Sequence, residues 1–265
     1  MRMLYSRDSL LSVYPEPIQI HRRDILREYL QCVILQYLFR WPDAGELIFI
    51  GGTSLRIVHG LPRFSEDLDF DNTGISYERF QVIIAHLCDQ LALLWLQTEV
   101  KYTHKQAYHA TIKLSNILTN YGLAPTTREE VQEKLVIKVD THDQQLQYEP
   151  MIIPLTTFGT NALIQVAPLE VIMAMKIYTI GQRRRAKGRD YFDLKFLMDK
   201  GIHPNHEILD QLLWWHDRQS TIAYLIDIIQ SQDKGYLIRD VQPFLFNAYD
   251  DSIKHFETYV EQYHR

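Results

Sequence analysis

A pair of glycines directly after a short apolar run constrains the fold of this chain more than any other feature. Residues 47–50 (Leu-Ile-Phe-Ile) have the length and apolar character of a buried strand, and Gly51 and Gly52 follow at once. Thr53 and Ser54 come next, and either hydroxyl can cap a helix. The sequence therefore predicts a strand, a tight turn and a helix, an arrangement whose backbone N–H groups can bind phosphate. An ordinary strand-to-helix turn is the alternative.

Two carboxylates follow on the next predicted strand. Asp67 and Asp69 are two residues apart, so their side chains point to one face if residues 67–70 are extended. Two like charges this close raise each other's pKa unless a cation lies between them. Mg²⁺ is usually held by one or two carboxylates plus substrate phosphates. The pair could also be solvated on an exposed strand, but a phosphate-binding turn followed by this pair favours one site for a nucleoside triphosphate with Mg²⁺.

A third acid would complete a two-metal site. Asp140 ends the apolar strand predicted over residues 135–140, so it can reach the edge of a sheet. Two ions in such a site activate an attacking hydroxyl and stabilise the leaving group. An aspartate that merely ends the strand in a turn is the alternative for Asp140.

Cationic and acidic side chains gather later in the chain. Lys176 lies in an apolar helix, where it either extends to water or points at a charge such as a triphosphate. Asp190 and Asp193 have the i, i+3 spacing of one helix face, and we expect Asp190 to cap that helix and to orient Lys176 or Arg189. The basic residues 183–189 could bind nucleotide phosphates or an RNA backbone, or could offset the dipole at a helix end.

The periodicity of apolar residues predicts a small mixed sheet with helices, followed by a helical region. The expected helices are residues 24–40, 53–59, 76–97, 168–182 and 190–197, with more helix after residue 204, and the expected strands are residues 47–50, 67–70, 99–102, 110–114 and 135–140. Residues 120–130 are expected to form a loop. We therefore divide the chain into an α/β core with an N-terminal helix (residues 1–160) and a helical C-terminal domain (residues 161–265).

Composition limits the classes of function. The chain has 265 residues, 46% of them hydrophobic, which is enough for a core in one large or two small domains. A formal charge of −5 argues against a wholly basic nucleic-acid-binding protein but leaves room for a local basic patch.

Cys32 and Cys88 lie in apolar runs and are expected to be reduced core thiols. We see no signal region and no apolar run of about 18 residues, so we expect a cytoplasmic protein without a membrane partner.

Taken together, the motifs resemble those of the AbiEii/AbiGii-type nucleotidyltransferase toxins, a family that includes the MenA/MenT-like toxins of bacterial toxin–antitoxin systems. The motifs occur in family order over about residues 45–200, and their combination is specific although no single motif is. They are Gly51-Gly52-Thr53 with Arg56, residues 64–69 (Phe-Ser-Glu-Asp-Leu-Asp), Glu170 to Lys176, and residues 189–194 (Arg-Asp-Tyr-Phe-Asp-Leu).

The resemblance implies a minimal nucleotidyltransferase fold of the DNA polymerase β kind: an α+β mixed-sheet core with a helical N-terminal extension and a helical C-terminal region. It implies transfer of a nucleoside monophosphate from an NTP to an acceptor hydroxyl, with Mg²⁺ as cofactor. In characterised relatives the acceptor is the 3′ end of tRNA, and an antitoxin protein is a further expected partner. Carried over by motif, Asp67 and Asp69 look like metal ligands, Gly52, Thr53 and Arg56 triphosphate contacts, Lys176 a nucleotide-phosphate contact and Asp190 a catalytic-site acid.

We therefore predict one site with three kinds of residue. They are the catalytic residues Asp67, Asp69, Lys176 and Asp190, the triphosphate contacts Gly51, Gly52, Thr53, Ser54, Arg56 and Arg189, and the metal ligands Asp67, Asp69 and Asp140. A nucleotidyltransferase that modifies a small molecule or a protein hydroxyl is one alternative, and a non-catalytic nucleotide-binding protein is another. The motifs encode neither the preferred base nor the acceptor nor the oligomeric state.

Overall fold

The computed structural model describes residues 5–123, 134–213 and 218–263, and the chain divides into two compact units. The first unit contains Met1–Gly60, Phe64–Gln145 and Met151–Val166. The second contains the short segments Leu61–Arg63 and Leu146–Pro150 together with Ala167–Arg265. The domain boundary at residue 160 stays a prediction.

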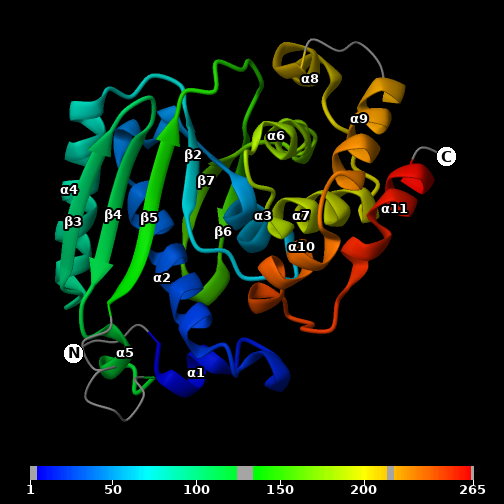
Figure 1. Cartoon of the computed structure of the whole chain (residues 1–265). Helices are drawn as coiled ribbons and strands as arrows, with labels where there is room; N and C mark the ends of the chain where they lie inside the picture. The colour runs from blue at the N-terminus through cyan, green and yellow to red at the C-terminus, as the bar shows by residue number, and fades with distance from the viewer. Residues whose placement is uncertain (1–4, 124–133, 214–217, 264–265) are drawn as a thin grey trace. The chain divides into compact units, whose positions relative to one another are not determined.

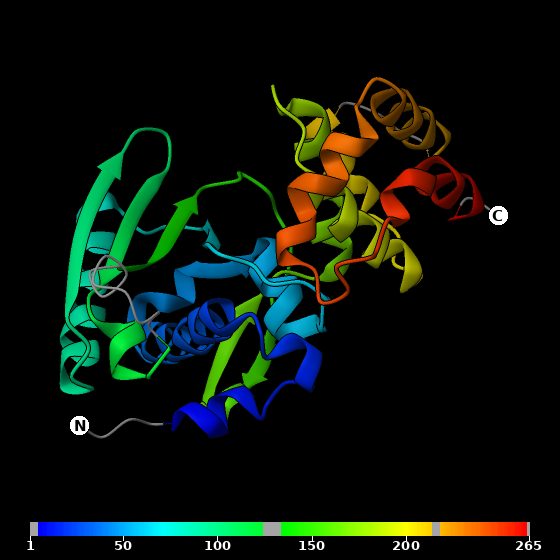
Figure 2. The ribbon, with the colours of Figure 1, turned by 60° about the horizontal axis from the view of Figure 1, so that its bottom comes forward.

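The first unit is built on a seven-stranded mixed sheet with the strand order β3-β4-β5-β2-β1-β7-β6 (Figure 1). The strands are β1 (Leu47–Ile50), β2 (Leu68–Asn72), β3 (Thr98–His104), β4 (Tyr108–Leu114), β5 (Leu135–His142), β6 (Met151–Leu155) and β7 (Ala162–Val166). Strand β2 runs antiparallel to β1 and parallel to β5, so these three strands form the middle of the sheet. The β3–β4 hairpin forms one edge and stands out at the left of Figure 2. All five predicted strands and the mixed α+β class are confirmed.

Strand β6 was not predicted from the sequence. It forms the other edge of the sheet, most of its residues are exposed, and Pro154 lies inside it. Proline lacks a backbone N–H and is tolerated in a sheet at an edge, where a donor is not needed on the open side. Residues 151–155 (Met-Ile-Ile-Pro-Leu) are apolar, but a proline inside so short a run argues against a strand when only the sequence is considered.

Two long helices cover one face of the sheet. They are α2 (Arg22–Leu38) and α4 (Tyr77–Leu93), which pack against each other and against the strands. The ring of Phe70 on β2 contacts that of Phe39 at the end of α2, 6.1 Å between centroids, so Asp69 points to the opposite face. Strand β5 repeats this pattern: Val139 is fully buried and Asp140 is half-buried. The predicted helices are confirmed, and Ser76 caps α4 as its side chain accepts the N–H of Arg79.

Helix α3 (Gly51–His59) starts two residues earlier than predicted. Its N-cap is Ile50, so the prediction that Thr53 or Ser54 caps this helix was wrong. Gly51 has a φ of +79°, a left-handed conformation that glycine adopts easily, and this turns the chain into the helix at once. The hydroxyls of Thr53 and Ser54 lie inside the helix instead of at its cap.

The remaining elements of the first unit are short. They are α1 (Arg7–Leu11), η1 (Glu16–Ile18), η2 (Pro42–Glu46), α5 (Ile117–Asn120) and η3 (Thr157–Gly159). Most of the predicted loop over residues 120–130 lies outside the described residues. Both cysteines are free thiols; Cys32 is in the core as predicted, whereas Cys88 is only partly buried.

The second unit is helical. Its elements are α6 (Leu169–Gln182), α7 (Gly188–Asp199), α8 (His206–Leu213), α9 (Arg218–Gln230), α10 (Lys234–Val241), η4 (Gln242–Phe244), η5 (Ser252–His255) and α11 (Phe256–Tyr263). The first residue of helix α7, Gly188, packs directly against α10. An added Cβ at Gly188 would lie 1.8 Å from the carbonyl oxygen of Leu237, so there is no room for a side chain. Among the described helices, none combines the length and the apolar character that crossing a membrane requires.

Candidate active site

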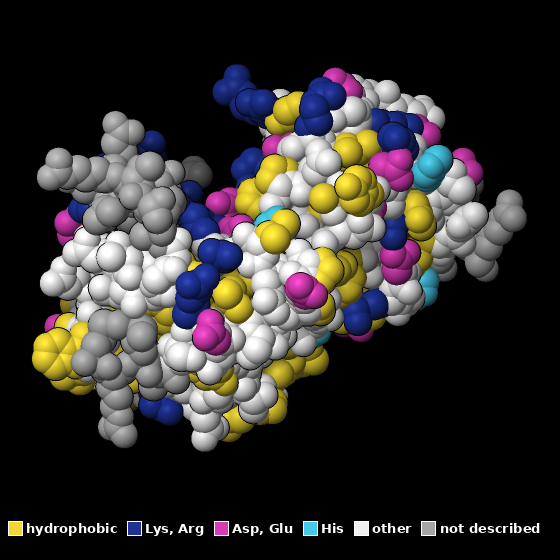
Figure 3. Space-filling view, turned by 90° about the horizontal axis from the view of Figure 1, so that it is seen from below, with side chains coloured by type: hydrophobic (Ala, Val, Ile, Leu, Met, Phe, Trp, Pro, Cys, Tyr) yellow, Lys and Arg dark blue, Asp and Glu magenta, His cyan; other side chains and the backbone are white. Residues whose placement is uncertain are grey.

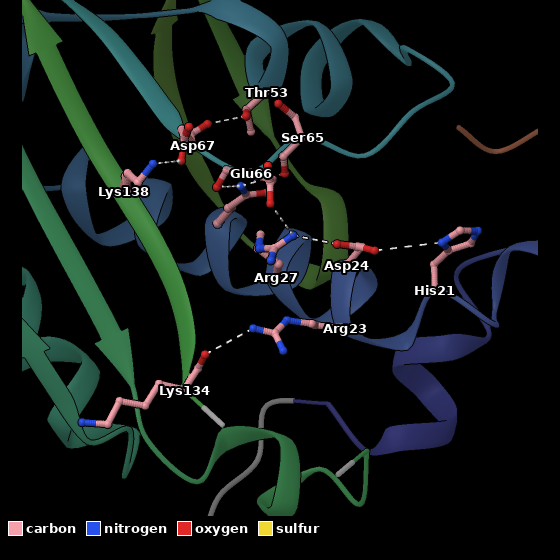
Figure 4. A network of polar contacts seen from close by, with 11 residues as sticks. His21, Arg23, Asp24, Arg27, Thr53, Ser65, Glu66, Asp67, Lys134 and Lys138 are labelled. Atoms are coloured by element: carbon pink, nitrogen blue, oxygen red, sulfur yellow. Dashed lines mark hydrogen bonds and ion pairs between the residues drawn. The ribbon is translucent and has the colours of Figure 1, made fainter. Parts of the chain in front are cut away.

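The glycine turn and the acid pair lie side by side in the first unit. An ideal Cβ built on Gly51 would be 2.7 Å from Oδ2 of Asp69, so this carboxylate lies directly against the turn. The hydroxyl of Thr53, two residues further on, donates a hydrogen bond to the backbone carbonyl of Asp67 (Figure 4). The two motifs that the sequence suggested as one site are therefore in contact.

This contact predicts that Gly51→Ala is far more harmful than an ordinary glycine substitution. Alanine at φ +79° is strained by about 1–2 kcal/mol, and its methyl group would also displace the Asp69 carboxylate. Gly60 is a matched control, because it has a φ of +77° and an added Cβ there would have nothing within 4 Å. We expect both variants to lose similar stability in thermal unfolding, but only Gly51→Ala to lose the nucleotidyl transfer that the sequence motifs lead us to expect. Equal activities would contradict the contact.

A second carboxylate faces Asp69 from the neighbouring strand. Asp69 is paired in register with Asp140 across the parallel strands β2 and β5, so both side chains lie on the face away from α2 and α4. Oδ1 of Asp140 forms a hydrogen bond with Nδ1 of His109 at 2.9 Å, and Nζ of Lys138 lies 3.6 Å from the Asp67 carboxylate. The Lys138 ammonium group offsets part of the negative charge that the three acids bring to this face.

The donor set fits Mg²⁺ bound together with a phosphate ligand. Within the described ranges, no group of three or more His, Cys, Asp or Glu side chains is arranged to hold a metal by itself. Mg²⁺ needs only one or two carboxylates when phosphate oxygens and water complete its six ligands. Asp67 and Asp69, half-buried beside a helix N-terminus, supply that number. The role of Asp140 as a third ligand stays a prediction.

The phosphate-binding capacity of α3 lies in its backbone. Thr53 and Ser54 are fully buried, and the Thr53 hydroxyl is used by the Asp67 carbonyl. The first N–H groups of a helix have no partner within the helix, so those of Gly51, Gly52 and Thr53 can bind an anion. Ser54 has a buried hydroxyl without a hydrogen-bond partner among the described residues.

Arg56 belongs to a buried cluster. Its Nε donates to Glu28 at 2.9 Å, and the hydroxyl of Tyr14 donates to the same carboxylate at 2.5 Å. Burial opposes the charge of Arg56, but the Glu28 carboxylate and the Tyr14 hydroxyl together outweigh burial and raise the pKa of Arg56. Burial and the same carboxylate also raise the pKa of Tyr14. Arg56 thus holds α3 against α2. Because its Nε is already bound to Glu28, that atom cannot also donate a hydrogen bond to a triphosphate.

The other predicted catalytic residues lie in the second unit. Nζ of Lys176 on α6 is 3.0 Å from Asp190 and 2.7 Å from Asp193, both on α7. The expected contact between Asp190 and Lys176 is therefore present, and Arg183 adds a second cation 2.6 Å from Asp190. The prediction that Asp190 caps α7 was wrong, because the helix begins at Gly188 with Lys187 as its N-cap and Asp190 lies in its first turn. Burial opposes the charge of Lys176, but Asp193 and Asp190 raise its pKa. Burial likewise opposes ionisation of Asp190, but Lys176 and Arg183 lower its pKa.

Arg63 completes this cluster and was not predicted from the sequence to belong to it. Its guanidinium makes two hydrogen bonds to Asp193, 2.6 Å and 2.7 Å long, and both side chains are almost completely buried. Arg63 stands next to Phe64, directly before the acid motif, and nothing in the local pattern indicates a partner 130 residues away. Asp193, whose role could not be assigned from the sequence, joins Arg63 to Lys176.

The pKa shifts predict how the second unit responds to pH. The pKa of Asp190 is lowered by folding, so its contribution to stability is present above its ordinary pKa and is lost as pH falls through the lowered value. The pKa of Lys176 is raised, so its contribution is present below its ordinary pKa and is lost as pH rises through the raised value. We expect a stability plateau from about pH 4 to 10 in thermal unfolding. A maximum below pH 4 would contradict this.

The basic residues 183–189 have different surroundings. Arg183 is bound to Asp190, Arg185 lies over the ring of Tyr236 at 5.0 Å, and Arg189 lies over the ring of Phe244 at 4.7 Å. Arg184 is exposed and has no carboxylate within ion-pair distance in the described part of the chain. The segment therefore combines one exposed cation that is paired with the buried Asp190 carboxylate and others that lie over aromatic rings or face solvent.

A mixed sheet with a glycine turn after β1, two acids at the start of β2 and a helical second unit defines a minimal nucleotidyltransferase of the DNA polymerase β kind. A family model described as nucleotidyl transferase AbiEii toxin, type IV toxin–antitoxin system, matches residues 34–261. The chain belongs to this family.

Solved structures support the fold. The chain is similar to JHP933 from Helicobacter pylori, with 19% identity, a TM-score of 0.57 and coverage of 91% of each chain. It is also similar to a candidate nucleotidyltransferase from H. pylori, with 20% identity, a TM-score of 0.56 and coverage of 89% of this chain and 92% of that one. No curated protein matches the sequence significantly.

Proposed function

We propose that this nucleotidyltransferase-family protein transfers a nucleoside monophosphate from an NTP to a hydroxyl at the 3′ end of tRNA, with Mg²⁺ as cofactor. One observation carries the proposal: the Asp69 carboxylate lies against the Gly51 turn at the start of α3. An anion-binding helix start beside two cation-binding carboxylates is suited to a triphosphate with its metal. An RNA acceptor would make the reaction that of a toxin, since a blocked tRNA end cannot be charged.

The chain's own residues would divide the work as follows. The N–H groups of Gly51, Gly52 and Thr53 bind the triphosphate, and Asp67 and Asp69 hold Mg²⁺, with Asp140 as a further acid. A bound Mg²⁺ would offset charge on the phosphates and lower the pKa of the acceptor hydroxyl, whose proton would pass to solvent water. The acceptor oxygen then attacks the α-phosphate in line, and pyrophosphate leaves.

In the second unit, we assign Lys176 to the phosphates of the nucleotide and Asp190 to its orientation. The 3.0 Å ion pair between them fixes the ammonium group, and a fixed charge stabilises the leaving pyrophosphate without reorganisation. Arg189 would add charge to the same phosphates. Arg56, because its Nε is bound to Glu28, is assigned to the positioning of α3.

The outward cations of residues 184–187 favour RNA as the acceptor. Arg184, Arg185 and Lys187 have no carboxylate partner within ion-pair distance in the described chain, so their charge is available to phosphates. The face shown in Figure 3, however, has Lys and Arg side chains interspersed with Asp and Glu. Because the net charge is −5, a protein or small-molecule hydroxyl is retained as a second acceptor class in the test.

Label transfer tests the proposal. The protein is incubated with each of the four α-³²P-labelled NTPs, Mg²⁺ and total tRNA, and parallel reactions contain EDTA or carry protein in place of tRNA. We expect label at the 3′ end of tRNA with at least one NTP and none with EDTA. Label in protein or a small molecule would replace the acceptor, and no label with any NTP would overturn the enzymatic proposal.

Family membership also supports two proposals about context. A type IV toxin–antitoxin system contains an antitoxin, so we propose a cognate antitoxin protein as a partner. Because NTPs and tRNA are cytoplasmic, we propose that the protein acts there.

A further inference from the structure

Helix α2 carries a set of buried polar side chains that the proposed reaction does not use. Arg27, Glu28 and Gln31 have exposed fractions of 8%, 2% and 0%. They lie at positions i, i+1 and i+4, so they occupy one side of the helix, whereas most other buried side chains of α2 are apolar. Burying polar and charged groups is unfavourable unless they are paired, so their partners indicate what this side of α2 does.

The first partner is the segment that leads into the acid pair. Nε2 of Gln31 donates to the carbonyl oxygens of Ser65 at 3.1 Å and of Glu66 at 2.9 Å. Arg27 adds a weaker contact, with NH1 at 3.6 Å from the Glu66 carboxylate and 2.6 Å from Asp24. Two consecutive backbone carbonyls are therefore bound by a single side chain of α2.

The segment needs such partners because it lies outside the sheet. Strand β2 begins at Leu68, and its paired register with β1 and β5 starts there or one residue later. Asp67 is thus the residue just before the paired ladder, so its position depends on contacts outside the ladder. The Gln31 amide fixes the two carbonyls before it, and the Thr53 hydroxyl fixes its own carbonyl.

The second partner of α2 is the phosphate-binding helix. The Glu28 carboxylate accepts from Nε of Arg56 on α3, and the Tyr14 hydroxyl donates to its other oxygen. Tyr14 in turn packs against the ring of Phe64, at 5.7 Å between centroids, directly before Ser65. One side of α2 therefore contacts both α3 and the approach to Asp67.

We propose that Gln31, Glu28 and Arg27 are positioning residues, which set the Asp67 carboxylate and the start of α3 at the spacing that one metal-bound triphosphate requires. Apolar side chains of similar volume would be at least as stabilising in a buried helix face, so stability alone does not account for the polar set. Fixing the residue next to a metal ligand is a known way in which an outer group controls metal affinity. This inference rests on the proposed function, because it takes Asp67 to be a metal ligand.

Binding of a metal–triphosphate complex tests the proposal without any acceptor or base. The full chain is titrated calorimetrically with the Mn²⁺ complex of inorganic triphosphate, at a temperature well below the unfolding midpoint of each variant. Gln31→Met removes both donated hydrogen bonds and keeps the volume. We expect it to bind the complex about 10–100-fold more weakly than the wild type, the range typical of outer groups at metal sites.

Gln36→Met is the matched control. Gln36 is on the same helix, and its amide also contacts the backbone, because its Oε1 accepts the N–H of Asn161, far from the acid pair in the sequence. Its affinity for the complex should stay within about twofold of the wild type. If Gln31→Met does not fold, Glu28→Gln, which removes the charge that holds Arg56, should weaken binding in the same way.

The outcomes separate the two proposals. Weaker binding by Gln31→Met or Glu28→Gln, with unchanged binding by Gln36→Met, supports the positioning role. Wild-type affinity in both of the first two variants, or equal weakening in all three, overturns it. No binding by the wild type itself overturns the metal–triphosphate site of the proposed function and the positioning role with it, whereas label transfer to tRNA by the wild type, together with wild-type affinity in Gln31→Met and Glu28→Gln, overturns only the positioning role.

Discussion

Replacing Asp69 by alanine should lower nucleotidyl transfer by at least about 10²–10³-fold, the loss typical of removing one group that stabilises transition-state charge. The side chain is half-buried on the face of the sheet away from α2 and α4, in register with the carboxylate of Asp140 and against the turn of α3. Its removal also relieves repulsion between like charges, so we expect the midpoint of thermal unfolding without metal to stay almost unchanged.

The measurement pairs label transfer with thermal unfolding on the same preparations. Asp89→Ala is the control, since Asp89 is an exposed acid on α4, the helix that covers the other face of the sheet. It should leave both quantities unchanged. Residual activity above about one tenth in Asp69→Ala, or a large fall in its unfolding midpoint, would contradict the assignment.

Breaking the ion pair between Arg63 and Asp193 should have the largest effect on stability. Asp193→Ala leaves a buried guanidinium without its two-point partner and takes one carboxylate from Lys176. Removing one partner of a buried ion pair costs about 3–5 kcal/mol, because the other charge stays buried. We expect a loss of that size in the free energy of unfolding of the second unit, measured by urea titration.

A double variant distinguishes the free energy lost with the ion pair from the cost of burying one charge without its partner. In Arg63→Met with Asp193→Leu no charge of the pair remains, so a large part of the stability should return. Asp251→Ala, which breaks the exposed contact with Lys254, should not differ measurably from the wild type. A single variant as stable as the wild type, or a double variant less stable than Asp193→Ala, would show that the pair does not carry this energy.

The candidate site was partly predictable because two of its motifs are close in the sequence. Thr53 in the glycine turn and Asp67 in the acid pair are 14 positions apart in the sequence. Segments that are close in the sequence and joined by one helix usually lie side by side in a sheet. The period of two predicted that Asp67 and Asp69 share one face of their strand. The register that pairs Asp69 with Asp140 across β2 and β5 came only from the structure. The role of each residue in catalysis remains for the experiments above.

What the residues could not predict are contacts that join distant parts of the chain. The partner of Arg56 is Glu28 and that of Arg63 is Asp193, and neither pairing follows from periodicity or from a local motif. For the same reason Arg56 was predicted as a phosphate contact, although its Nε is bound inside the core. A charged side chain looks the same in a sequence whether its partner is a ligand or a buried acid.

The sequence by itself determined the local structure of this protein: the strands and helices, the turn at Gly51 and the spacing of Asp67 and Asp69. These depend on apolar periodicity, backbone freedom and side-chain direction, which act over a few residues. Only the tertiary structure decided which polar groups are used inside the protein and which remain for a ligand. That division depends on burial, because a buried charge must find a partner wherever the folded chain supplies one.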